Sequence, residues 1–266
     1  MQVVQRAIVS CAVVLVACAT PAFAQNGMAN MVDHIHLAVP DQGKGVEWYR
    51  KHFGGQPTTE APERLMFGET RVIFQKNEAA QPSTGSVLDH IGFSVADLDA
   101  TVRNLAADGA KVVTPAREVA GLFKLAFVED PWGVRIEVVQ DPEKIGLHHV
   151  HLRAPDPAAA LAWYVDRVGG TIGKLKDRID GVNYGGIWIL VQRGEATPSV
   201  GHAIDHIGFR PLDVDSVVAG LKAKNVKVTT EPRPLTLASG ATMRLAFIEG
   251  PDGVRIELVQ RFRPER

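Results

Sequence analysis

Residues 125–140 read LAFVEDPWGVRIEVVQ, and residues 245–260 read LAFIEGPDGVRIELVQ, so that twelve of the sixteen positions are identical. Each copy predicts a strand, a tight turn in which proline fixes φ and glycine supplies a positive φ, and a second strand. Side chains alternate along a strand, which places Glu137 and Glu257 mid-strand among apolar residues. Because a lone buried carboxylate is costly, each glutamate is expected to have a cation or a metal ion as its partner.

The repeat is wider than this stretch. The segment DHIGF occurs at residues 89–93 and again at 205–209, and DHIHLAVPD at 33–41 corresponds to HHVHLRAPD at 148–156. The chain is therefore predicted to be a duplication.

The halves of the duplication are predicted at residues 31–142 and 146–262, with the polar residues 141–144 as the linker. Each half divides again into two modules, and each module has a strand, a helix and about three further strands. Four such modules, numbered 1 to 4 along the chain, predict an α+β fold.

The N-terminus reads as an export signal. An apolar run follows Arg6 and ends in Ala22-Phe23-Ala24, an A-x-A cleavage pattern that predicts removal of residues 1–24 and a periplasmic or secreted protein. The run is too short for a membrane span. The alternative is a lipoprotein signal, in which LVAC at residues 15–18 leads to a lipid anchor on Cys18.

Composition excludes several partners and chemistries. The formal net charge of −1 makes no electrostatic case for nucleic acid. Both cysteines, Cys11 and Cys18, lie in the signal, so the mature protein is expected to have no disulfide and no cysteine nucleophile. The expected partner is a small-molecule substrate.

Each half carries two histidines at the starts of strands and one glutamate in mid-strand. Neutral imidazoles with one carboxylate suit a divalent metal ion. A single histidine of this kind is more often an ordinary core or surface residue, but a set of three that recurs in register favours metal ligands. The two predicted sets are His34, His90 and Glu137, and His149, His206 and Glu257.

The order of strand-borne histidine, helix, strands and a D-P-x-G-x-x-I-E motif resembles the vicinal oxygen chelate superfamily. That superfamily includes glyoxalase I, methylmalonyl-CoA epimerase, extradiol ring-cleaving dioxygenases and bleomycin resistance proteins. The strongest matches are residues 88–93 and 130–137 with their repeats. The resemblance implies tandem βαβββ modules paired into two cupped half-barrel lobes, with a metal ion in each cup.

The resemblance also implies the ligands. The histidine in the first strand of a module maps onto His34, His90, His149 and His206, and the glutamate of the closing strand maps onto Glu137 and Glu257. One divalent ion per lobe is expected, which is iron, manganese, zinc, nickel or copper. The expected lobes pair module 1 with 2 and module 3 with 4. If module 1 instead pairs with module 4, His34 joins His206 and Glu257.

One departure from the family pattern bears on the chemistry. Sites like that of glyoxalase I take a fourth ligand from the last strand of the odd-numbered module, and the positions aligned there are Val72 and Ile189, which cannot bind a metal ion. Each site then has three protein ligands, which resembles the two-histidine, one-carboxylate site of extradiol dioxygenases.

Further polar residues lie near these positions. His36 and His151 follow a predicted ligand by two residues on the same strand face, as either proton-transfer groups or histidines at the rim of the site. Alternation turns His148 to the other face, as a surface residue. Tyr49 and Tyr164 are predicted to pack in the core.

The sequence thus predicts an exported, divalent-metal-dependent enzyme that binds a small substrate through vicinal oxygens, with extradiol dioxygenase-like ring cleavage as the leading interpretation. The alternative is a lyase or isomerase of the glyoxalase or epimerase type. A further alternative is a metal-free small-molecule-binding protein of the drug-resistance type.

Overall fold

The computed structural model describes residues 27–262 of the 266-residue chain. The predicted signal, residues 1–24 with Cys18, lies outside the described residues, so export remains a prediction. Within residues 27–262 no helix is long and apolar enough to cross a membrane.

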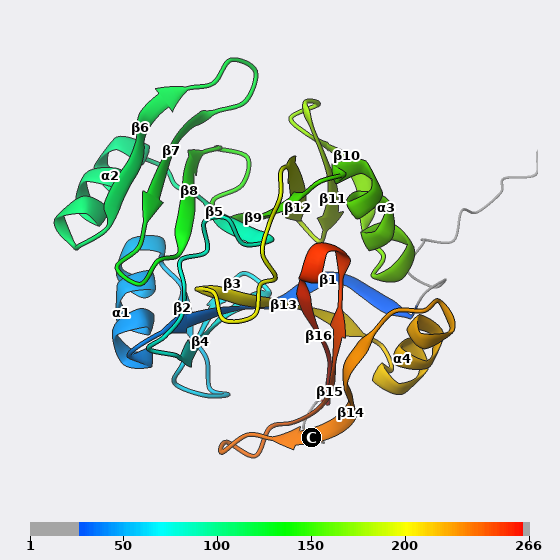
Figure 1. Ribbon diagram of the computed structural model, residues 1–266. Helices are drawn as coiled ribbons and strands as arrows, with labels where there is room; N and C mark the ends of the chain where they lie inside the picture. The colour runs from blue at the N-terminus through cyan, green and yellow to red at the C-terminus, as the bar shows by residue number, and fades with distance from the viewer. Residues whose placement is uncertain (1–26, 263–266) are drawn as a thin grey trace, which may run out of the picture.

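Four βαβββ modules follow one another along the chain, as predicted (Figure 1). Module 1 contains β1 (Met28–Val39), α1 (Gln42–Phe53), β2 (Gln56–Pro57), β3 (Arg64–Phe67) and β4 (Thr70–Lys76). Module 2 contains β5 (Leu88–Ser94), α2 (Leu98–Ala107), β6 (Lys111–Glu118), β7 (Lys124–Glu129) and β8 (Arg135–Gln140). Module 3 contains β9 (Gly146–Ala154), α3 (Pro157–Arg167), β10 (Thr171–Leu175), β11 (Ile179–Tyr184) and β12 (Ile187–Arg193). Module 4 contains β13 (Ile204–Pro211), α4 (Val214–Ala223), β14 (Val228–Thr236), β15 (Thr242–Glu249), the short helix η2 (Pro251–Gly253) and β16 (Arg255–Arg261).

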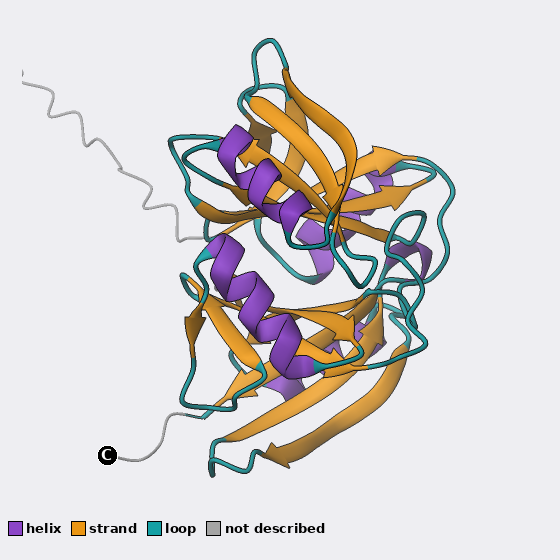
Figure 2. Ribbon diagram, turned by 90° about the vertical axis from the view of Figure 1, so that its left-hand side faces the viewer, coloured by secondary structure: helices purple, strands orange, loops and turns teal. Residues whose placement is uncertain are grey.

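The modules form two mixed eight-stranded sheets (Figures 1 and 2). The β1–β13 sheet has the order β14-β15-β16-β13-β1-β4-β3-β2, and the β5–β9 sheet has the order β10-β11-β12-β9-β5-β8-β7-β6. Module 1 therefore pairs with module 4, and module 2 pairs with module 3. The expected pairing of 1 with 2 and of 3 with 4 is wrong, and the alternative pairing of module 1 with module 4 is the one observed.

The lengths of the connectors account for this pairing. Residues 141–145 are the only link between β8 and β9, and such a short connection keeps modules 2 and 3 in one sheet. Residues 77–87 and 194–203 are longer and carry the chain from one sheet to the other. These two connectors lie side by side, joined by the parallel bridges Gln81 to His202 and Ser86 to Thr197.

The helices begin where the sequence offers an aspartate cap. The side chains of the N-cap residues accept hydrogen bonds from backbone N–H groups of the first helical turn, which otherwise have no partner. These caps are Asp41, Asp97, Asp156 and Asp213. The helix-facing sides of both sheets share one hydrophobic core, and Tyr49 and Tyr164 are fully buried in it, as predicted.

The repeated turn of residues 130–133 is fastened to this core. Asp130 accepts hydrogen bonds from the backbone N–H groups of Trp132 and Val134 and from the Tyr49 hydroxyl, the last at 2.8 Å. The turn thereby fixes the start of β8 and the position of Glu137 on it. Glu137 lies on the face of its sheet opposite the helices, which we call the site face.

Candidate metal centres

Two clusters of side chains that could hold a metal ion lie on the site faces, one in each sheet. In each cluster the donor atoms all lie within 4.8 Å of one another. The first site, in the β1–β13 sheet, consists of His34, His36, His206 and Glu257. The second site, in the β5–β9 sheet, consists of His90, Glu137, His149 and His151.

All eight candidate residues from the sequence thus come together, but in other groups than expected. The sets His34, His90, Glu137 and His149, His206, Glu257 do not converge, because the two halves of each set belong to different sheets. Each observed site combines the first strands of two modules and the closing strand of the even-numbered one.

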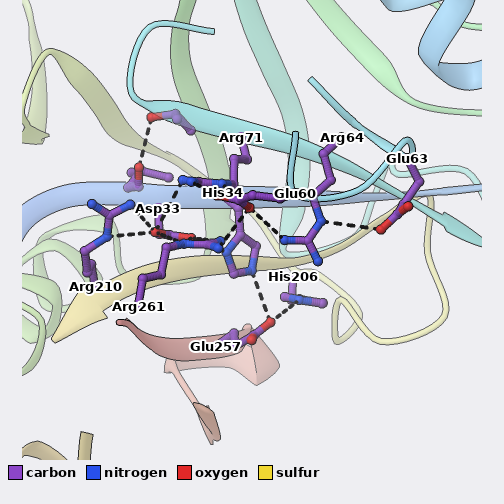
Figure 3. A network of polar contacts seen from close by, with 12 residues as sticks. Asp33, His34, Glu60, Glu63, Arg64, Arg71, His206, Arg210, Glu257 and Arg261 are labelled. Carbon is purple, nitrogen blue, oxygen red and sulfur yellow. Dashed lines mark hydrogen bonds and ion pairs between the residues drawn. The ribbon is translucent and has the colours of Figure 1, made fainter. Parts of the chain in front are cut away.

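In the first site two imidazoles point at one carboxylate oxygen (Figure 3). The Nε2 atoms of His34 on β1 and of His206 on β13 each lie 3.1 Å from Oε2 of Glu257 on β16. His36 stacks on the ring of His206 with a centroid separation of 4.1 Å. The arrangement brings three imidazoles and one carboxylate around one point.

The second site repeats this geometry. The Nε2 atoms of His90 on β5 and His149 on β9 lie 3.2 and 3.1 Å from Oε2 of Glu137 on β8. The ring of His151 lies 4.6 Å from that of His90, measured between centroids. Both sites are built from the same strand positions, as expected of a duplication.

In three of the imidazoles the ring nitrogen Nδ1, on the side away from the glutamate, contacts an aspartate carboxylate. Asp33, Asp89 and Asp205 each precede a histidine, and their Oδ1 atoms lie 2.9, 2.8 and 2.7 Å from Nδ1 of His34, His90 and His206. An Nδ1–H that donates to a carboxylate leaves the Nε2 lone pair available for a metal ion.

An arginine contacts the aspartate behind one histidine of each site. Arg135 and Arg255 do not pair with the glutamates, because their guanidinium groups pair instead with Asp89 at 3.2 Å and with Asp205 at 2.9 Å.

His149, the fourth of these histidines, has His148 as its neighbour, and the expectation that His148 is a surface residue is wrong. His148 is buried, and its Nδ1 lies 2.9 Å from Nδ1 of His149, while its Nε2 lies 3.3 Å from Oδ2 of Asp141. The register shifts at this point, since Gly92 pairs with His149 and Phe93 with Leu147. Such a β-bulge breaks the strict alternation that had placed His148 on the opposite face.

Two glycines make room for the imidazoles. A Cβ atom on Gly208 would lie 2.1 Å from Cε1 of His34, and a Cβ atom on Gly92 would lie 2.1 Å from Cε1 of His149. In each site the glycine lies on the first strand of the even-numbered module and the imidazole reaches across it from the neighbouring strand. The glycine of the DHIGF segment is therefore a requirement of the site.

The register corrects the expected place of a fourth ligand. Glu257 pairs with Gly208 and Glu137 with Gly92, whereas the equivalent partners of His36 and His151 are Ile73 and Leu190. These apolar residues take the positions that the sequence alignment had given to Val72 and Ile189. A candidate fourth donor comes instead from the first strand itself, as His36 and His151, so each cluster offers four donors where three were expected.

Charge and burial lower the pKa of the glutamate and of one histidine in each site, for different reasons. Burial favours the neutral form of the carboxyl groups, but hydrogen bonds and positive charge from the histidines outweigh it and hold the pKa of Glu137 and of Glu257 well below its usual range. Burial and the neighbouring imidazoles lower the pKa of His36 and of His151 well below its usual range. Each site thus offers an ionised carboxylate and a neutral imidazole.

This donor set fits a divalent metal ion. Neutral imidazole nitrogens and one carboxylate oxygen are ligands that zinc, iron, nickel and copper accept. Among the described residues, Nδ1 of His36 and Nδ1 of His151 are buried without a hydrogen-bond partner. A buried polar atom without a hydrogen-bond partner costs free energy, and a ligand bound in the site would remove that cost.

The sequence analysis missed the residues that surround the donors. Asp89, Asp205, Gly92 and Gly208 all lie in the repeated DHIGF segment, whose aspartate and glycine recur with the histidine. A buried aspartate beside a ligand histidine and a glycine in mid-strand were the available signals.

The fold consists of two sheets of paired βαβββ modules, and each sheet carries a site of histidines and one carboxylate. This combination defines a class of protein, and comparison with known families identifies it. The model of the Glyoxalase/Bleomycin resistance protein/Dioxygenase superfamily matches residues 31–138 and 146–258. The chain belongs to this superfamily, as the sequence resemblance implied.

Relatives with curated names carry glyoxalase descriptions. A probable lactoylglutathione lyase of Synechocystis is 31% identical over 126 residues, which are 43% of this chain and 94% of that protein. The putative glyoxylase CFP32 of Mycobacterium tuberculosis is 24% identical over 256 residues, which cover 86% of this chain and 93% of the relative. Among solved structures, glyoxalase I from Zea mays superposes with a TM-score of 0.69 at 21% identity and covers 86% of this chain and 92% of its own.

Proposed function

We propose that this chain is a divalent-metal-dependent lyase or isomerase of the glyoxalase type. The observation that carries the proposal is the set of four donors in each site, three imidazoles and one carboxylate. Ring cleavage was favoured by a three-ligand site, and that argument no longer holds once His36 and His151 join the clusters. The names of the relatives, lactoylglutathione lyase and glyoxylase, support the same choice.

Each residue of the two sites is assigned a role in this proposal. His34, His36, His206 and Glu257 would hold one ion, and the four equivalent residues of the second site would hold another. A bound divalent ion would supply Lewis-acid polarisation of substrate oxygens. Glu257 contacts both imidazoles through Oε2 alone, which leaves Oε1 to accept and return a substrate proton. Proton transfer by His36 or His151 remains the alternative.

The surroundings of the second site favour this chemistry. A cluster of apolar side chains lies on the site face beside it, and the edge of Phe127 meets the ring of His90 with centroids 5.2 Å apart. An apolar wall excludes water and strengthens electrostatic interactions inside the site. The buried members of this cluster are Phe123, Leu125, Val139, Leu175 and Leu190.

A paired activity screen tests the proposal. Protein loaded separately with zinc, nickel, manganese and iron is mixed with 2-oxoaldehydes and a thiol, and product formation is followed alongside oxygen uptake on catechols. We expect metal-dependent turnover of the 2-oxoaldehyde–thiol adduct and no oxygen uptake. Oxygen uptake with ring opening of a catechol, and no turnover of the adduct, would restore the dioxygenase interpretation.

The metal-free alternative is tested by the same preparations. A drug-sequestering protein would bind small molecules equally well before and after chelation and would contain no stoichiometric metal. The two buried donor sets are the reason that we do not favour it.

We also propose that the protein is exported. The apolar run and the Ala22-Phe23-Ala24 pattern before Gln25 support cleavage after Ala24. The intact mass of the protein recovered from the periplasm or the medium should correspond to a chain that begins at Gln25. A diacylglyceryl group on an N-terminal Cys18 would show that the lipoprotein interpretation is correct.

A further inference from the structure

The first site is surrounded by arginines. Arg64 on β3, Arg71 on β4, Arg210 on β13 and Arg261 on β16 all take part in one network of ion pairs around His34 (Figure 3). The side chains of Arg64, Arg71 and Arg261 are only 8%, 11% and 14% exposed. Buried guanidinium groups require anionic partners.

One carboxylate on a loop satisfies three of these guanidiniums. Glu60 lies between β2 and β3, and its Oε2 accepts hydrogen bonds from Arg64 Nη1 at 3.1 Å, Arg71 Nε at 3.0 Å and Arg261 Nη1 at 3.1 Å. Arg71 Nη2 also donates to Oε1 of Glu60, which completes a two-pronged contact. This is the geometry by which arginine recognises a free carboxylate.

The arginine pocket adjoins the first metal centre. Arg71 pairs with His34 across the β1–β4 ladder, so the two side chains share one face. Arg261 Nη2 donates to Oδ1 of Asp33 at 2.7 Å, and the same oxygen holds Nδ1 of His34. A carboxylate in the place of Glu60 would therefore lie beside a substrate in the first site.

The second site lacks this pocket. The strand registers align Arg71, opposite His34, with Trp188, opposite His149. In the same way, Arg64 corresponds to the residue opposite Leu190 in the β11–β12 ladder. Arg210 corresponds to the residue two places after Gly92. Arg261 corresponds to the residue four places after Glu137. The corresponding residues are Gly181, Ser94 and Asp141. Four cationic positions are thus uncharged or acidic in the second site, where Trp188 also packs against the apolar cluster.

We propose that the two sites take different substrates, and that the first binds a carboxylate between Arg64, Arg71 and Arg261 in place of Glu60. The second site takes an apolar substrate. The inference deepens the proposed function, since it assigns a substrate class to each centre. Strands hold the three arginines, whereas Glu60 lies outside the strands, on the loop between β2 and β3. Glu60 thus acts as an internal occupant that an anionic ligand must displace.

Succinate binding to metal-free protein tests this pocket. Titration calorimetry at constant ionic strength compares the wild type with Glu60→Gln, which keeps the side-chain shape but removes the competing charge. A tethered group competes at an effective concentration in the millimolar range, so Glu60→Gln should lower the Kd of succinate by at least about tenfold. Adding Arg71→Met to this variant should abolish binding.

Asp177→Asn is the matched control. Asp177 lies in the equivalent hairpin loop of module 3, between β10 and β11, and is exposed with a φ of 57°, which asparagine tolerates. It removes the same charge and should leave succinate binding unchanged. If Glu60→Gln folds only when succinate replaces chloride at equal ionic strength, that rescue also supports the pocket.

Several results would overturn the proposal. These are an equal Kd in the wild type and Glu60→Gln, retained binding after Arg71→Met, or a Glu60→Gln chain that succinate does not rescue. Tighter binding of inorganic phosphate than of succinate would show that the ligand is not a carboxylate. Because the titration uses metal-free protein, a failure of the metal proposal leaves its outcome unaffected.

Discussion

Glu257→Ala is expected to remove one of two metal equivalents from the chain, and Glu137→Ala is expected to remove the other. Each glutamate is the only anionic donor of its cluster and lies about equally far from two imidazole nitrogens. Changes in the outer shell of metal sites already lower affinity about 10- to 100-fold, so loss of a charged ligand should cost at least about 100-fold. Elemental analysis after dialysis against a weak chelator measures the loss.

Glu249→Ala provides the control for the first site. Glu249 is an exposed glutamate on β15 of the same sheet, where it pairs with Lys227, and its loss should leave both equivalents in place. Turnover of the same variants identifies the working centre, because a reaction that survives Glu137→Ala but not Glu257→Ala belongs to the first site. If both alanine variants keep two equivalents, the glutamates serve only as partners of the histidines.

Gly208→Ala and Gly92→Ala should each disable one site without touching a donor atom. The added Cβ would lie 2.1 Å from Cε1 of His34 or of His149, and both rings are buried. The imidazole must leave its position, so that site should lose metal affinity by about 100-fold or more, while the other site is unchanged. Metal titration of the apo-protein with a spectroscopic competitor would resolve the two affinities.

Gly220→Ala is the control for the glycine variants. Gly220 lies on α4, and apart from its chain neighbours and the backbone of its own helix no described atom lies within 4 Å of a Cβ placed there. Alanine in a helix is favoured over glycine by roughly 1 kcal/mol, so this variant should keep both metals and melt at the same or a higher temperature. Unchanged metal affinity in Gly208→Ala would mean that His34 does not need its observed position.

Much of the fold and of the donor set could be predicted from the sequence. The duplicated segments that contain His90, His206, Glu137 and Glu257 predicted four βαβββ modules, and all eight proposed site residues lie in the two clusters. These predictions depend on local patterns, the alternation along a strand and the identity of the turn residues. Such local patterns can be recognised in a single sequence.

The arrangement between modules could not be predicted in the same way. Repeats in sequence show which segments are alike but not which of them pair, and only the shortness of residues 141–145 indicated that modules 2 and 3 share a sheet. The bulge beside His148 also escaped prediction, because one extra residue in a strand reverses the face of its neighbours. His36 and His151 were predicted as proton-transfer or rim histidines and not as donors, because the family alignment places a fourth ligand on the last strand of each odd-numbered module.

Each pair of modules that shares a sheet is proposed to build one metal centre. Diffraction from metal-loaded crystals, recorded at the absorption edge of the bound metal, tests it most directly. The anomalous map should contain one peak within about 2.0–2.2 Å of ligand atoms of His34, His36, His206 and Glu257. It should contain a second peak at the same distances from His90, Glu137, His149 and His151. A map without a peak at either cluster, or with a peak shared by His34 and His90, would contradict the account.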